Sequence, residues 1–267
     1  KAGEESGKLD QTFSYLADYL DRTYEITSKA KNALIYPAFV VFTFITVMIL
    51  MLTLVIPRIS SIFLESGQDL PIYTKIVIGL SDFFVNYGIF LFILIIIGGF
   101  FVWKFSKTKN GRISVSHMKL SLPYLGGLYK KLYLSRISDN LSTMLSSGIP
   151  MVRAVEITAN VVGDAVYEKL LIESMGDIKA GSPVSESLAK YPEIPNIMVQ
   201  MIKVGEETGE LGKILNTLSK FYSREVRNTV DTLITLIEPI LIVTLALGVG
   251  ILLASVLMPI YNISAGI

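Results

Sequence analysis

Three long stretches of the chain contain no charged residue, and the charged positions gather between them. They run from Asn32 to Pro57, from Phe83 to Trp103, and from Pro239 to the C-terminus. Each is as long as the ~20 apolar residues that cross a bilayer as one helix. Only helices and closed barrels satisfy their backbone polar groups inside lipid. The pattern therefore predicts three transmembrane helices, at 33–57, 83–103 and 233–259.

The rest of the chain shows the three- and four-residue spacing of amphipathic helices. In residues 1–32 this spacing joins Leu9, Phe13, Leu16 and Leu20, as in a helix with one buried face. In residues 104–232 glycine and proline fall at helix spacing, and the alternating runs typical of strands do not occur. We therefore expect an all-α protein, with a bundle of about six helices in residues 104–232.

Glycine and proline also predict where the bundle helices begin and end. Gly148 closes a helix that starts near Leu128, and Pro150 opens the next helix. A further helix is expected over 164–180, and Pro183 starts a short one after it.

The stretch GEETGELGKIL, at 205–215, has a close copy near the start of the chain. The sequence 202 residues earlier reads GEESGKLDQTF, and the same register then pairs Pro57 with Pro259 without a gap. Such self-similarity indicates a tandem duplication, whose unit is a helical bundle followed by a transmembrane helix. The first copy starts almost at this stretch. We therefore expect about 70–90 further residues upstream that resemble 130–202.

The duplicated stretch has two compatible interpretations. In the first it is a tight corner, where Gly205 stops one helix and Thr208 caps the next. The glycines recur in the first copy, whereas Lys8 replaces the acidic Glu210. In the second it is an acidic docking point for a partner, made by Glu206 and Glu207 and, in the first copy, by Glu4 and Glu5.

The basic residues are unevenly distributed, although the formal net charge is only +1. Seventeen Lys and Arg lie between Lys104 and Asp231, whereas the connector 58–82 holds two and the tail 260–267 holds none. Because cytoplasmic segments of membrane proteins are enriched in Lys and Arg, residues 1–32 and 104–232 are predicted to be cytoplasmic. The connector and the tail are predicted to lie on the other side.

The sequence gives no sign of catalysis. Gly212-Lys213 resembles a phosphate-binding loop, but the spacing is wrong and Ile214 replaces the Ser or Thr that holds magnesium. The chain has no cysteine and a single histidine, His117, so thiol chemistry and a His-based metal site are not expected. We assign no catalytic residue, cofactor, metal site or nucleic-acid partner.

Several longer motifs carry a family resemblance. They are MLSSGIPMVRAVEIT, AGSPVSESL, ALIYPAFVV, LPIYTKIV, the two duplicated stretches and the C-terminal IEPILIVTLALGVGILLASVLMPIYNI. With them the chain resembles, over essentially its whole length, the inner-membrane platform protein of type IV pilus and type II secretion machines, truncated at its N-terminus.

This resemblance implies a non-enzymatic scaffold in the cytoplasmic membrane. Its expected partners are a hexameric assembly ATPase, pilins or pseudopilins, other inner-membrane assembly proteins, and a second copy of the chain. A small repeat-based transporter or channel is the alternative, but the predicted spans hold almost none of the charged or broken helices that it needs. An intramembrane protease would need paired aspartates or a His-based site in the spans, and the sequence has neither.

Some residues stand out as structural or partner-docking candidates. Lys130, Lys131 and Arg136 form a basic group that contacts water, lipid headgroups or acidic segments of an ATPase. Glu238 precedes Pro239 at the start of the third span, where it faces headgroup water or has a function. The full set is Gly3, Glu4, Glu5, Gly7, Lys130, Lys131, Arg136, Gly148, Pro150, Gly205, Glu206, Glu207, Gly209, Glu238 and Pro239.

Overall fold

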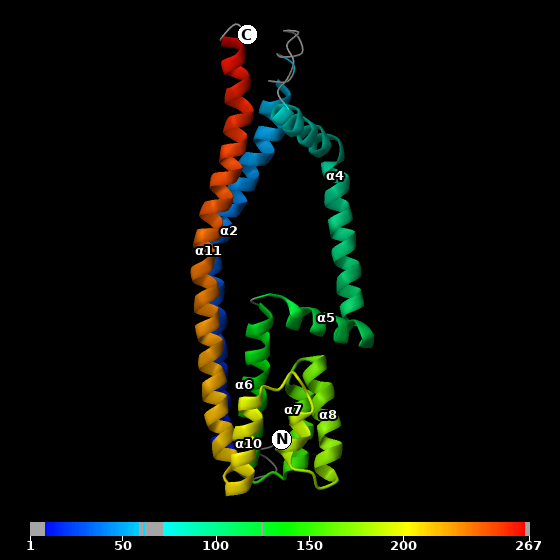
Figure 1. Ribbon diagram of the computed structural model, residues 1–267, viewed down its shortest axis with the longest axis vertical. Coiled ribbons are helices and arrows are strands. Elements are labelled where there is room, and N and C mark those ends of the chain that lie inside the picture. The colour runs from blue at the N-terminus through cyan, green and yellow to red at the C-terminus, as the bar shows by residue number, and fades with distance from the viewer. Residues whose placement is uncertain (1–8, 59–60, 62–71, 124, 265–267) are drawn as a thin grey trace. The chain divides into compact units, whose positions relative to one another are not determined.

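The computed structural model describes residues 9–58, 61, 72–123 and 125–264 (Figure 1). Every regular element within these residues is a helix, so the predicted all-α fold is confirmed. The elements are α2 (Leu9–Leu50), the π-helical turn η1 (Met51–Val55), α4 (Ile72–Ser106), α5 (Lys109–Ser121), α6 (Leu125–Ser146), α7 (Met151–Val161), α8 (Ala165–Lys179), α9 (Val184–Ala189), α10 (Asn196–Thr208) and α11 (Leu211–Ser264).

The chain divides into two compact units. The first comprises Lys1–Ser28 and Phe105–Leu233, and the second comprises Lys29–Lys104 and Ile234–Ile267. The divisions fall inside α2, α4 and α11. Each unit therefore contains parts of helices that continue into the other, and each is described by itself below.

Three helices are long and apolar enough to cross a membrane. The candidate segments are Lys31–Arg58, Ser81–Ser106 and Leu211–Ala254, which confirms the expectation of three such helices. The third is longer than its predicted span because α11 begins in the bundle sequence and continues without a break (Figure 1). The residue boundaries predicted for the spans and connectors remain predictions.

The second unit carries its large apolar side chains on the outside. Phe90 is 66% exposed, and Ile240 and Leu247 are each 63% exposed. In water such a surface would be costly, but lipid tails are as apolar as these side chains. Pro37 lies inside α2. The helix continues past it, as expected for a proline in a membrane helix.

A few positions in the second unit are packed inside it. Leu52 and Ile56 are buried at the π-helical turn, and the buried Ser81 hydroxyl donates a hydrogen bond to the carbonyl of Leu52. On α11, Gly248 faces the ring of Phe44 so closely that a Cβ atom would overlap it. Small residues allow such close helix approach in membranes.

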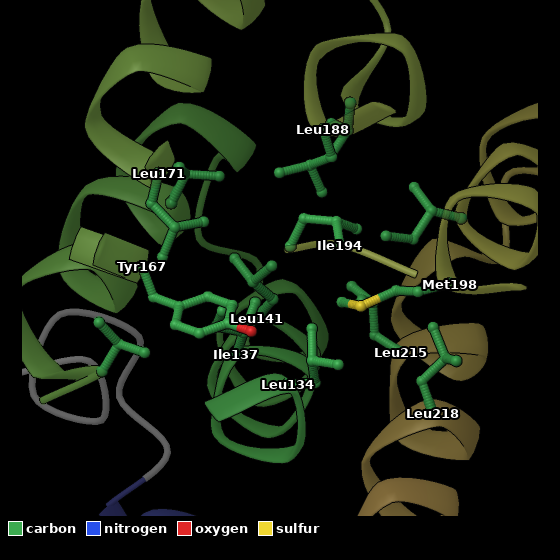
Figure 2. Close-up of a cluster of buried hydrophobic side chains, with 14 of the residues drawn as sticks. Leu134, Ile137, Leu141, Tyr167, Leu171, Leu188, Ile194, Met198, Leu215 and Leu218 are labelled. Carbon is green, nitrogen blue, oxygen red and sulfur yellow. The ribbon is translucent and has the colours of Figure 1, made fainter. Parts of the chain in front are cut away.

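The first unit has an ordinary hydrophobic core. Figure 2 shows how side chains from five segments converge: Leu134, Ile137 and Leu141 of α6, Tyr167 and Leu171 of α8, Leu188 of α9, Ile194 and Met198 at α10, and Leu215 and Leu218 of α11. Each is at most 5% exposed. Full burial of one such side chain contributes roughly 1.5–3 kcal/mol. This core is what holds α6–α10 and the start of α11 together.

Most predicted helix ends in this unit are confirmed. Gly148 has φ 82° and follows α6, where the amide of Ile149 donates to the carbonyl of Met144. Pro150 is the N-cap residue of α7, and Pro183 is the N-cap residue of α9. The left-handed backbone conformation of Gly148 ends the helix. Glycine suits this position because a residue with a Cβ atom adopts that conformation only with strain.

The prediction for the corner at 205–209 was wrong in detail. Gly205 does not stop a helix, because α10 runs through it to Thr208. The Thr208 side chain does not cap the next helix either, since its hydroxyl donates back to the carbonyl of Val204. Gly209 is the residue that ends α10, with φ 71°. α11 then begins at Leu211.

Candidate functional site

The corner between α10 and α11 still brings together the residues that the duplication singled out. Gly205 is buried, and a Cβ atom there would lie 3.0 Å from the Cα of Leu211 and 3.1 Å from Cγ1 of Ile214. Its role is thus to let α10 and α11 approach each other. Gly209 has open space around it, so only its backbone conformation requires glycine.

Glu206 acts as the cap of another helix. Its carboxylate accepts hydrogen bonds from the amide of Val184 at 2.5 Å and from the amide of Ser185 at 3.1 Å. It also accepts one from the Ser185 hydroxyl at 2.5 Å. The first amides of a helix have no partner inside the helix, and the N-cap residue Pro183 provides no side-chain acceptor. Glu206 therefore anchors α9 to α10.

The neighbouring Glu207 has a different environment, because its side chain is exposed. The two adjacent acids of the predicted docking point thus differ: the Glu206 carboxylate is hydrogen-bonded within the fold, whereas the Glu207 side chain is exposed. The equivalents in the first copy, Gly3, Glu4, Glu5 and Gly7, lie outside the described residues.

The three basic candidates on α6 contact three different parts of the first unit. Lys130 donates to the carbonyl of Pro192 at 3.3 Å, and Arg136 donates to the carbonyl of Val162 at 3.2 Å. Lys131 lies 2.9 Å from a carboxylate oxygen of Glu225 and 3.0 Å from the Thr229 hydroxyl. These contacts give each cation a structural role, whereas a docking role for them stays a prediction.

Sequence reasoning missed the polar contacts that join α6 to α11. In addition to the Lys131 contacts, the Ser219 hydroxyl donates to Asp139 at 2.8 Å, and the Ser142 hydroxyl donates to the carbonyl of Gly212 at 2.9 Å. Serines spaced along α6 were a possible signal, but their partners lie 70 or more residues away. No local pattern identifies them.

A buried polar pair fixes α5 to the start of α8. The Ser116 hydroxyl donates to Asp164 at 2.5 Å, and Asp164 also accepts from the amides of Val166 and Tyr167 as the N-cap of α8. Burial raises the pKa of Tyr133 to about 12, and the negative charge of Asp164 acts in the same direction. The hydrogen bond between Ser116 and Asp164 therefore fixes α5 against the start of α8.

Two clefts of about 660 and 200 Å³ lie near the start of α8, and Ser116 and Asp164 line the smaller one. Arg112 of α5 and Ala165 of α8 line both clefts. Within the described residues, no group of three or more His, Asp or Glu side chains is placed to hold a metal ion. Glu238 and Pro239 are exposed on α11.

The fold and the duplicated sequence together define a class of protein: an all-α membrane protein in which a bundle-plus-span unit is repeated. The model of the type II secretion system protein F family matches residues 1–57 and 137–259. The two matched segments end at Pro57 and Pro259, the pair that the duplication aligned. The chain belongs to this family.

Curated relatives carry names from two related machines. The chain is 33% identical over 265 residues to the type IV pilus assembly protein PilC of Thermus thermophilus, covering 98% of this chain and 65% of that protein. It is 30% identical over 263 residues to PilC of Pseudomonas aeruginosa, covering 98% of this chain and 70% of the relative. It is also 30% identical to type II secretion system protein F of Aeromonas hydrophila, covering 98% and 68%. The chain thus spans about two thirds of the length of these relatives.

Proposed function

We propose that this protein is a membrane platform of a type IV pilus or type II secretion machine. In this role it couples a cytoplasmic assembly ATPase to the polymerisation of pilins or pseudopilins. The observation that carries the proposal is the family match, which covers both copies of the duplicated unit. The chain supplies the scaffold and the ATPase performs the catalysis.

The continuity of α11 supports a mechanical role. Leu215, Leu218 and Tyr222 of this helix are buried in the core of the first unit. The same helix continues through the apolar residues after Glu238 without a break. An α-helix passes a displacement along its axis better than a flexible linker does, because each turn is held by backbone hydrogen bonds. A push on the bundle would therefore be transmitted into the membrane.

We further propose that the bundle lies in the cytoplasm. The distribution of Lys and Arg supports this side of the membrane. The 267 residues contain no cysteine, so Lys203→Cys, at an exposed position of α10, adds one thiol at a known place in the bundle. In intact cells we expect a membrane-impermeant maleimide to label this variant only after the inner membrane is opened. Labelling before that step would place the bundle on the other side and end the proposal.

Glu207 is our proposed docking residue for the ATPase. Glu206 is a poor site for charge reversal because its loss removes the α9 cap, and Lys131 variants would break the contact with Glu225. Glu207→Lys avoids both problems, and Glu173→Lys on α8 is a control at another exposed acid, whose contacts are with the Tyr191 hydroxyl and Lys169.

The test is co-purification of the full-length protein with the assembly ATPase of the same organism. We expect Glu207→Lys to weaken the association by about tenfold, the scale of one lost charge-assisted contact, and Glu173→Lys to leave it unchanged. If the wild type never associates while filaments or secretion persist, the coupling role is wrong. If both variants bind normally, only the assignment of Glu207 is wrong.

A further inference from the structure

The turn that joins α4 to α5 is basic and lies directly after a candidate span. Ser106 is the last residue of the span Ser81–Ser106. Lys107, Lys109 and Arg112 follow, with no acidic residue among them. The interfacial layer outside the hydrocarbon core is only about 5–8 Å thick on each side. A lysine one residue beyond the span therefore lies at the depth of the lipid phosphates when α4 crosses the membrane.

Arg112 lies near the start of α5, close to the end of α4. The hydroxyl of Thr108 accepts from the amide of Gly111 at 3.1 Å and so caps the start of α5. A Cβ atom on Gly111 would overlap the carbonyl of Phe105. The α4–α5 turn is therefore tight, and Arg112 follows the very residue that packs against the end of α4.

Lys107 and Arg112 border the larger of the two clefts. This cleft, of about 660 Å³, lies between α5 and α8 and is lined by Lys107, Arg112, Ile113, Ala165, Glu168 and Ile172, among others. Ile172 is 48% exposed although it is large and apolar. The cleft thus combines two cations at the turn and an apolar wall with Lys169 and the carboxylates of Glu168 and Glu173.

We propose that the α5–α8 cleft binds an anionic phospholipid. The phosphate is held by Lys107 and Arg112, and part of one acyl chain packs against Ile113 and Ile172. A free phosphate ion would use the cations alone and leave the apolar wall uncovered. The inference requires α4 to cross the membrane. It does not depend on the coupling to an ATPase.

Two carboxylates, Glu168 and Glu173, also line the cleft, and Glu168 competes with the lipid phosphate for Arg112. It pairs with Arg112 at 3.5 Å, and the two side chains are 36% and 58% exposed, respectively. Ion pairs of this exposure are weak, so a phosphate can replace the carboxylate without a large loss. Removing this carboxylate should therefore strengthen lipid binding, whereas removing the cations should weaken it.

Native mass spectrometry of the full-length protein in detergent tests the proposal. The probes are phosphatidylglycerol and phosphatidylcholine with the same acyl chains, with and without millimolar inorganic phosphate. We expect the wild type to retain phosphatidylglycerol in preference to phosphatidylcholine, and inorganic phosphate not to displace it. The double variant Lys107→Gln/Arg112→Gln should lose this preference, with affinity falling about thirtyfold for two basic residues.

Matched variants distinguish the loss of this site from a general loss of positive charge and from misfolding. Lys203→Gln/Lys220→Gln removes two exposed cations outside the cleft and should leave lipid binding unchanged. Glu168→Gln should raise phosphatidylglycerol affinity several-fold. Ile172→Glu, at a position that is 48% exposed, should reduce binding of either lipid at this site.

Three results would overturn the proposal. The first is equal retention of both lipids by the wild type, and the second is an unchanged preference in Lys107→Gln/Arg112→Gln. The third is displacement of the lipid by inorganic phosphate, which would make the cleft a simple anion site. Intact ATPase association in a variant that has lost lipid binding would show that this site and the coupling role are separate.

Discussion

The two halves of α11 use the same apolar residue types in opposite ways. In the first unit Leu218 is fully buried and Tyr222 is 4% exposed, and apolar positions recur every three or four residues. In the second unit Ile240 and Leu247, on the same helix, are each 63% exposed. A helix that packs on a core and faces water on its other side carries a single apolar stripe. Lipid imposes no such requirement, so the second half is apolar all round.

The difference shows where packing energy is concentrated. A leucine in the bundle gains its stability from neighbours that exclude water, whereas a leucine on the outer face of a span exchanges protein contacts for lipid contacts. The same substitution should therefore have very different costs at two positions on one continuous helix.

The largest expected effect tests this contrast directly. Leu218→Ala should lower the free energy of unfolding by about 3 kcal/mol, since it removes buried methyl groups and leaves a cavity. Leu247→Ala should change it by less than about 1 kcal/mol, because lipid fills the space. Denaturant unfolding of the protein in matched detergent micelles, followed by circular dichroism, measures both. Similar losses in the two variants would mean that Leu247 is packed against another part of the protein.

The next effect compares two adjacent acids within the bundle. Glu206→Ala should lower the stability of the first unit by about 2–3 kcal/mol, because the amides of Val184 and Ser185 lose a charged acceptor. Glu207→Ala, at an exposed carboxylate, should stay within about 0.5 kcal/mol of the wild type.

Hydrogen exchange at the start of α9 distinguishes this cause from a general loss of stability. In Glu206→Ala the amides of Val184 and Ser185 should exchange faster than those of the core helix α8, whereas Glu206→Gln should restore part of the protection through its remaining oxygen. Uniform acceleration across the bundle would contradict a local capping role.

These two acids also mark the limit of prediction from sequence. Local chemistry was sufficient at Gly148 and Pro183, where a left-handed glycine and an N-cap proline act directly at their own helix ends. It failed at the α10–α11 corner. Either Gly205 or Gly209 could end the helix, and only the packing against α11 gives Gly205 its different role. The partner of Glu206 lies 21–22 residues away, and the fold alone brings them together.

A smaller effect concerns the packed side of the membrane half. Gly248→Val should destabilise the second unit by about 1–3 kcal/mol, because the new side chain would overlap Phe44. Gly250→Val is the control, since nothing lies within 4 Å of the Cβ position there. Denaturant unfolding of the two variants in matched detergent micelles, with Phe44 kept in place, measures the difference. Equal stability of the two variants would show that α2 and α11 do not pack at this point.

The smallest expected effect is on the free energy of unfolding, and its sign should differ between two buried tyrosines replaced by phenylalanine. The hydroxyl of Tyr222 is buried and has no hydrogen-bond partner among the described residues, whereas the Tyr167 hydroxyl donates to the carbonyl of Glu193 at 3.3 Å. Tyr222→Phe should therefore leave stability unchanged or raise it by up to about 1 kcal/mol, since an unsatisfied polar group is removed. Tyr167→Phe should lower it by about 0.5–1.5 kcal/mol. Denaturant midpoints measured side by side resolve the two. A clear loss in Tyr222→Phe would mean that a water molecule bonds this hydroxyl, and the start of α11 would then be less dry than the rest of the core.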